Sequence, residues 1–193
     1  SRSVEKDVES LYRIYKTEKH LNKFRMFYPQ IVKKFSLYFQ SEILMARFLV
    51  DMKEYSEAKE ILTRLNQQEP IASAYYWLAR IAQLEKDWDS MELTIQKATV
   101  LDPANSQYHS IFSNLLKRLK KLERAEREAG YAIEYRTKPS PWLFNNRAWI
   151  RWARGNYPGA VEDWKTAIAL KPERADFHAH IAEAYRKMND RSQ

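Results

Sequence analysis

The sequence contains no cysteine, which excludes disulfides, thiolate metal sites and cysteine nucleophiles. Only 3 of its 193 residues are glycine and 7 are proline, so there is little room for long irregular loops. No apolar run reaches the roughly 18 residues that a membrane helix needs. The richest stretch, 31–50, is interrupted by charged side chains. The absence of cysteine fits a reducing compartment, and together with the lack of a membrane segment it favours the cytoplasm.

Apolar residues make up 45% of the chain and charged residues 30%, enough for a core and too apolar for a disordered segment. The length suits one ordinary domain or a stack of about five helix pairs. Because the chain begins at Ser1 rather than Met, we expect it to be a segment of a longer protein.

Small and bulky residues recur along the chain at nearly constant spacing. Four columns step by 33, 34 and 35 residues: Ala58, Met91, Ala125, Ala160; Leu65, Ala98, Ala132, Ala167; Tyr55, Trp88, Leu122, Tyr157; and Ala46, Ala79, Ser113, Ala148, the last continuing to Ala182. A period near 34 residues is typical of a solenoid of helix pairs, in which each pair buries its apolar face against its neighbours.

Local signals place helices within this period. From 72 to 84, apolar residues fall at i, i+3, i+4 and i+7, which is one face of a helix. A second helix is expected from about Asp89, taken as its N-cap, to Asp102, because the following Pro103 disfavours helical backbone before it. Ser140 followed by Pro141 predicts the start of a later helix.

This pattern resembles the tetratricopeptide repeat family. The unit at 141–174 has the most family residues: Phe144, Ala148, Gly155, Tyr157, Ala160, Trp164, Ala167 and Pro172. The resemblance covers roughly 39–190 and implies an all-α, right-handed α-solenoid of antiparallel helix pairs. It predicts these segments: 1–38, an N-terminal helical cap or degenerate repeat; units 39–71, 72–105, 106–140 (irregular) and 141–174; and 175–193, a C-terminal capping helix and tail.

In this family the first helices of the units line a concave groove. Carried onto this chain, the resemblance implies these groove residues: Arg47, Arg80, Asn114, Lys117, Arg118, Trp142, Asn145, Trp149 and Trp152. The last four are spaced i, i+3, i+7 and i+10, on one helical face. The tryptophans either form an aromatic shelf for a peptide or a partner's helix, or pack against the capping helix and one another.

Charge is distributed unevenly along the chain. The net charge is +5 over 1–38, −4 over 39–105 and +7 over 106–154. The most basic block includes Lys117, Arg118, Lys120, Lys121, Arg147, Arg151 and Arg154. A positive field favours acidic partners, so we expect a protein or peptide of acidic or aromatic character. Nucleic acid is not the expected partner. The basic, aromatic segment 23–34 could rest on a membrane surface.

Some family members hold the carboxylate terminus of a chaperone. Asn114 and Asn146 match two of the residues that such a clamp uses, but Asp176 stands where a cation is needed. The clamp is incomplete in this chain, so a chaperone tail is not the expected partner.

We therefore predict a protein–protein interaction scaffold that binds a peptide or partner helix. The alternative is a soluble regulatory or assembly domain of a larger, membrane-bound protein. Catalysis and cofactors are not expected, because the glycines are scattered and His178 and His180, spaced i, i+2, point to different sides of a helix. The sequence does not indicate an oligomeric state.

Overall fold

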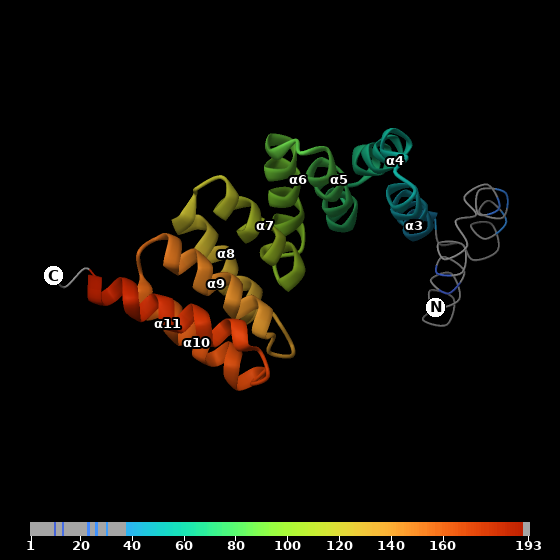
Figure 1. The fold of residues 1–193 in the computed structure, drawn as a ribbon. Coiled ribbons are helices and arrows are strands. Elements are labelled where there is room, and N and C mark those ends of the chain that lie inside the picture. The colour runs from blue at the N-terminus through green and yellow to red at the C-terminus, as the bar shows by residue number, and fades with distance from the viewer. Residues whose placement is uncertain are drawn as a thin grey trace. The chain divides into compact units, whose positions relative to one another are not determined.

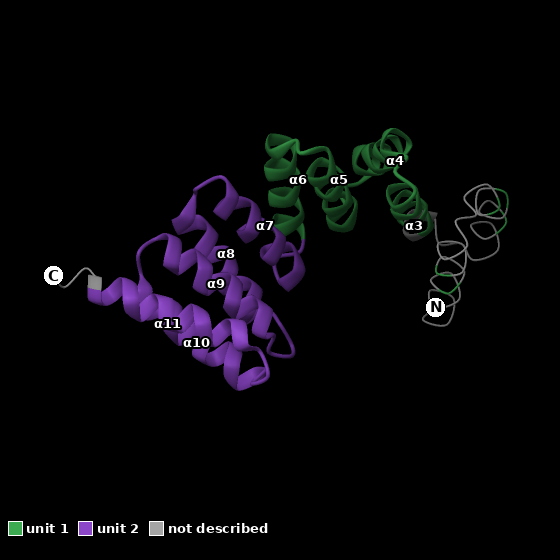
Figure 2. Ribbon diagram, in the orientation of Figure 1, with its two compact units in different colours: residues 1–101 green, residues 102–193 purple. Residues whose placement is uncertain are grey.

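The computed structural model describes residues 38–190 and the single positions 10, 13, 23, 26 and 30. Apart from those positions, the expected N-terminal cap (1–38) and membrane-surface segment (23–34) lie outside the described residues. The chain divides into two compact units, residues 1–101 and 102–193 (Figure 2). Every regular element in the described part of both units is an α-helix, so the predicted all-α class is confirmed.

Unit 1 contains two consecutive helix pairs in its described part (Figure 1). The helices are α3 (Tyr38–Asp51), α4 (Tyr55–Gln68), α5 (Ala72–Glu85) and α6 (Trp88–Leu101). Phe48, Leu49, Leu62 and Ile81 are fully buried in one apolar cluster that joins α3, α4 and α5. These residues supply much of the apolar area whose burial stabilises the unit.

Unit 2 contains two further pairs and a single terminal helix (Figure 1). They are α7 (Ser106–Arg118), α8 (Leu122–Glu134), α9 (Pro141–Ala153), α10 (Tyr157–Leu170) and α11 (Ala175–Asp190). The core of α9, α10 and α11 is centred on Trp164 and Phe177, both fully buried. Within the described residues of both units, none of the helices is long and apolar enough to cross a bilayer.

The repeat period reappears in the backbone of the turns between paired helices. Lys53, Lys86, Lys120 and Gly155 have φ of 68°, 63°, 62° and 79°, and their positions again step by 33, 34 and 35. The N–H of the next residue donates to the carbonyl five residues earlier at 2.8–2.9 Å in all four turns. Left-handed backbone favours glycine at such helix ends, yet three of the four turns use lysine.

The column of small residues is buried where two helices meet. Ala46, Ala79, Ser113 and Ala148 are all 0% exposed, so these helices approach closely at the predicted positions. Ala182, the next member of the column, is exposed. No second helix follows α11 within residues 38–190 to cover it.

The start of α6 differs from the prediction. The helix begins at Trp88, and the capping carboxylate belongs to Asp87 rather than Asp89. Asp87 Oδ1 accepts a hydrogen bond from the backbone N–H of Ser90 at 3.1 Å, which satisfies one free donor of the first turn. Hydrogen bonds from Ser90 also lower the pKa of Asp87.

Candidate binding faces

In unit 1 the first helices of the pairs, α3 and α5, bring two predicted arginines close to the same aromatic residues. The guanidinium carbon of Arg47 lies 5.9 Å from the ring centroid of Trp77, which meets Tyr76 edge to face at 5.3 Å. Arg80 donates to Gln83 at 2.6 Å. Burial raises the pKa of Tyr76, and the charges of Arg80 and Arg47 partly offset that rise. Sequence analysis missed Tyr76, although it lies one turn before Arg80.

In unit 2, Lys117 of α7 is a half-buried cation. Its Nζ donates to Asn146 Oδ1 of α9 at 3.1 Å, and Asn146 Nδ2 donates to Ser113 Oγ at 2.9 Å. No carboxylate among the described residues lies within ion-pair distance of the Lys117 ammonium. Burial lowers the pKa of Lys117. The site therefore lacks the negative charge that would compensate a partly desolvated cation.

The other two predicted residues of α7 are exposed. Asn114 Nδ2 donates to the Ser110 carbonyl of its own helix at 3.0 Å. Arg118 is the last residue of α7. Both are therefore accessible from solvent, on the same helix as Lys117.

Three of the four predicted residues of α9 gather around the buried indole of Trp164. Asn145 Oδ1 accepts from Trp164 Nε1 at 3.0 Å. The Trp149 ring lies 5.3 Å from Trp164 and 4.7 Å from His180 of α11, and Trp152 lies 6.0 Å from Trp149. Trp149 and Trp152 remain partly exposed. They therefore pack against the terminal helix while still presenting part of their surface to solvent.

Trp142 lies apart from this cluster. It is 47% exposed, and its ring meets Phe177 edge to face at 6.0 Å. The Arg174 guanidinium covers the ring at 4.5 Å from the centroid and pairs with Asp176 through hydrogen bonds of 2.8 and 2.5 Å. The bond from Arg174 lowers the pKa of Asp176 to about 2. Asp176 is thus an acceptor for Arg174.

A second polar cluster in unit 2 joins α8, α9 and α10. Arg147 donates to both carboxylate oxygens of Asp163, at 3.0 and 2.6 Å. Arg151 lies 3.1 Å from the same carboxylate and donates to Glu126 at 2.9 Å, and Arg154 also pairs with Glu126. Asp163 is only 2% exposed. Sequence analysis assigned these arginines only to the positive field, although their i, i+4, i+7 spacing indicates one helical face.

His109 of α7 is buried with acceptors on both ring nitrogens. Nδ1 lies 2.6 Å from Glu128 Oε2, and Nε2 lies 2.9 Å from the Pro103 carbonyl. Neither acceptor can donate, so the cationic ring, with two N–H donors, fits this site best. Burial lowers the pKa of His109, but the bonds to Glu128 and Pro103 and the charges of Glu128 and Asp102 outweigh it, and the pKa is raised overall.

We expect His109 to make the stability of unit 2 depend on pH. Because the pKa of His109 is higher in the folded chain than in the unfolded chain, the protonated ring stabilises the fold. This stabilisation is fully present below the pKa of the unfolded chain, near 6.5, and is lost as the pH rises through the pKa of the folded chain. Urea unfolding from about pH 5.5 to about pH 9 should show this loss. In the His109→Gln variant this part of the pH dependence should vanish. A profile shared by both proteins would contradict the assignment.

The chain matches a model of the TPR repeat over residues 150–189. None of the curated protein sequences is significantly similar to it. Among solved structures, a tetratricopeptide repeat protein from Parabacteroides merdae ATCC 43184 aligns with a TM-score of 0.71 and 14% identity, over 98% of this chain and 75% of that one. YrrB, a TPR protein with an unusual peptide-binding site, aligns with a TM-score of 0.66 and 16% identity, over 92% and 89%.

The first TPR of Spaghetti (RPAP3), bound to the HSP90 peptide SRMEEVD, aligns with a TM-score of 0.56 and 17% identity, over 61% of this chain and 93% of that one. At these identities the structural alignments establish the shared fold. The repeat sequence at 150–189 and the consecutive helix pairs of both units agree with it. The chain therefore contains a TPR repeat at residues 150–189 and shares the fold of tetratricopeptide repeat proteins.

Proposed function

We propose that this chain is a protein-interaction scaffold that binds an acidic segment of a partner through unit 2. The binding surface is the face of α7 and α9, the first helices of the two pairs, and is called the Lys117 face below. Lys117 is the observation on which the proposal rests. A half-buried ammonium that meets only a neutral amide gains an electrostatic partner when a carboxylate arrives. The exposed Asn114 and Arg118 on the same helix offer further donors to an incoming acidic chain.

Two further features support an extended or helical protein segment as the ligand. Trp149 and Trp152 on α9 keep part of their rings exposed, and tryptophan is enriched at binding hot spots. Two proteins of the same fold, YrrB and the first TPR of Spaghetti, are described with peptide-binding sites or bound peptides. Tetratricopeptide repeats therefore provide surfaces on which such binding is established in other proteins.

The proposal predicts that affinity for an acidic peptide depends on Lys117. A fluorescent peptide rich in glutamate should bind the chain more tightly than the same peptide with every glutamate replaced by glutamine. Lys117→Met should weaken binding of the acidic peptide about tenfold, because one charge-assisted hydrogen bond contributes on the order of 1.5 kcal/mol. Fluorescence anisotropy measures the preference for the glutamate peptide and the loss of affinity in Lys117→Met. Repeating it at a second salt concentration shows how far each depends on charge.

Lys138→Met is the matched control, since it removes the same charge from an exposed loop residue of unit 2. It should change the affinity less than twofold, an effect of general charge alone. Equal loss in the two variants, or equal binding of the glutamate and glutamine peptides, would contradict the proposed site. Substituting Trp149 or Trp152 by alanine tests the shelf separately: unchanged binding would mean that the rings serve packing only.

A further inference from the structure

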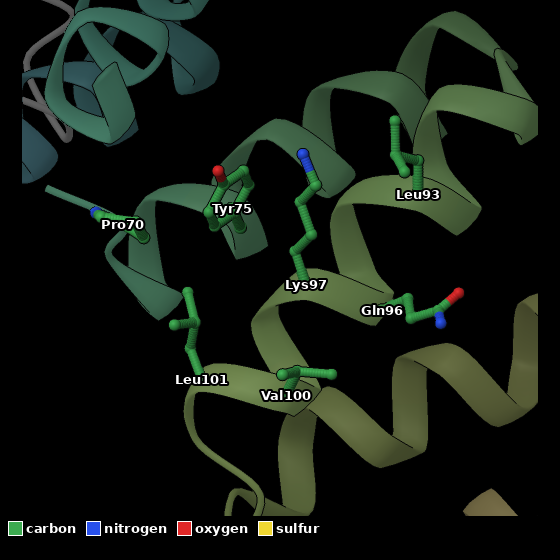
Figure 3. A pocket seen from close by; sticks show the side chains of 7 residues that line it. All are labelled: Pro70, Tyr75, Leu93, Gln96, Lys97, Val100 and Leu101. Carbon is green, nitrogen blue, oxygen red and sulfur yellow. The ribbon is translucent and has the colours of Figure 1, made fainter. Parts of the chain in front are cut away.

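An apolar recess lies beside α5 and α6, the second helix pair of unit 1. Its volume is about 380 Å³, and its lining residues are Pro70, Tyr75, Leu93, Gln96, Lys97, Val100 and Leu101 (Figure 3). Leu93 is 58% exposed, Val100 71% and Leu101 44%. Such exposure of three large aliphatic side chains around one recess is unusual for a solvated helix surface.

The repeat itself provides the comparison for this surface. At the positions that correspond to Leu93, the other second helices have Glu60, Arg127 and Glu162. At those that correspond to Val100 they have Gln67, Glu134 and Ala169. Among the four second helices in the described part of the chain (α4, α6, α8 and α10), only α6 has a large aliphatic residue at both positions. The repeat fold does not require apolar residues there, so the exposed apolar surface of α6 needs a separate explanation.

Lys97 places a positive charge in the middle of this apolar surface. Its Nζ lies 5.1 Å from the ring centroid of Tyr75 on α5, and Figure 3 shows the side chain extending toward that ring. Among the residues that the structure describes, no carboxylate lies within ion-pair distance of it. A cation held among apolar side chains without an acidic partner is complementary to an apolar ligand that carries a carboxylate.

We propose that this recess docks an amphipathic helix of a partner protein, with its apolar face on Leu93, Val100 and Leu101 and a carboxylate on Lys97. Leu93, Lys97 and Val100 are spaced i, i+4 and i+7, so they form one stripe about 10 Å long on α6. A helix that docks on such a surface contacts it through residues spaced i, i+3/i+4 and i+7, which extend over a similar length. The site is independent of the Lys117 face, which belongs to unit 2.

The probe is a labelled, helix-forming peptide with leucines on one face and glutamates beside them. Its two controls are the same peptide with lysine in place of glutamate, and a scrambled peptide without an apolar face. The full chain should bind the glutamate peptide best in fluorescence anisotropy. Amide shifts in NMR should concentrate on α6 and on the Tyr75 turn of α5.

The test variant is Leu93→Glu with Val100→Gln, which copies Glu60 and Gln67 of α4 onto α6. Both replaced side chains are more than half exposed, so circular dichroism should show an unchanged fold. Binding of the glutamate peptide should fall at least about tenfold, and Lys97→Gln alone should weaken it about fivefold. Leu170→Gln, an exposed leucine on α10, is the control and should change the affinity less than twofold.

Two results would overturn the proposal. The first is equal binding of the glutamate peptide to the wild type and to the double variant. The second is concentration-dependent dimerisation of the wild type that the double variant abolishes, because a second copy of the chain would then be the occupant. Lys117→Met should leave binding of this helical peptide unchanged, so failure of this site and failure of the proposed function are distinguishable.

Discussion

Replacing Trp164 by alanine is expected to destabilise unit 2 by about 3–5 kcal/mol, the usual cost of truncating a buried large aromatic. Trp164 is fully buried and contacts residues of α9 and α11. Its ring lies 5.3 Å from Trp149 and from His180, and its Nε1 donates to Asn145. The substitution leaves a cavity where α9, α10 and α11 meet. It also removes the indole N–H that donates a hydrogen bond to Asn145 Oδ1. Urea unfolding monitored by circular dichroism measures the loss.

Trp142→Ala is the matched control for this prediction. It removes the same side chain from the neighbouring helix, but the ring is 47% exposed. We expect a loss of roughly 1–2 kcal/mol, from the contacts with Phe177 and the Arg174 guanidinium. Equal destabilisation by the two substitutions would show that Trp164 is not the centre of the core.

Asp163→Asn is the second substitution with a large expected effect, a loss of about 3 kcal/mol. The carboxylate is almost completely buried and pairs with both Arg147 and Arg151, whose side chains are only about one-fifth exposed. Its removal leaves Arg147 partly desolvated beside a neutral amide, whereas Arg151 keeps Glu126 as an acidic partner. Loss of one partner from a buried ion pair is costly because the remaining charge is uncompensated. Thermal and urea unfolding of the variant should both report the change.

The adjacent Glu162 offers a control with the same chemistry. It is exposed, and its carboxylate makes no ion pair with any residue that the structure describes. Glu162→Gln should therefore change the free energy of unfolding by less than about 0.5 kcal/mol. If Asp163→Asn is equally mild, then solvent and Glu126 compensate the charges of Arg147 and Arg151, and Asp163 contributes little to joining α9 and α10.

The repeat period predicted much of the fold because it reflects contacts that every unit must make. Ala46, Ala79, Ser113 and Ala148 are buried where the column predicts close helix approach. Ala182 belongs to the same column but is exposed, because burial at that position requires a neighbouring helix to cover it. A spacing argument contains no information about whether a covering helix is present.

The polar sites were harder to predict, because their geometry depends on contacts between helices distant in sequence. Lys117 was chosen from the family resemblance, but its bond to Asn146 spans 29 residues. Arg147 and Arg151 were assigned to a general positive field, since nothing in the sequence pairs them with Asp163, a residue on the next helix. Local chemistry also misled at α6, where two acids lie two residues apart and Asp87, rather than Asp89, caps the helix.

The pKa of Lys117, followed by NMR of its side chain with and without the acidic peptide, tests the proposed scaffold function most directly. In the free chain, burial should hold this pKa below its ordinary value. A carboxylate arriving on the ammonium should raise it, because a nearby negative charge favours the charged form. Binding of the peptide with no change in the pKa of Lys117 would contradict the account.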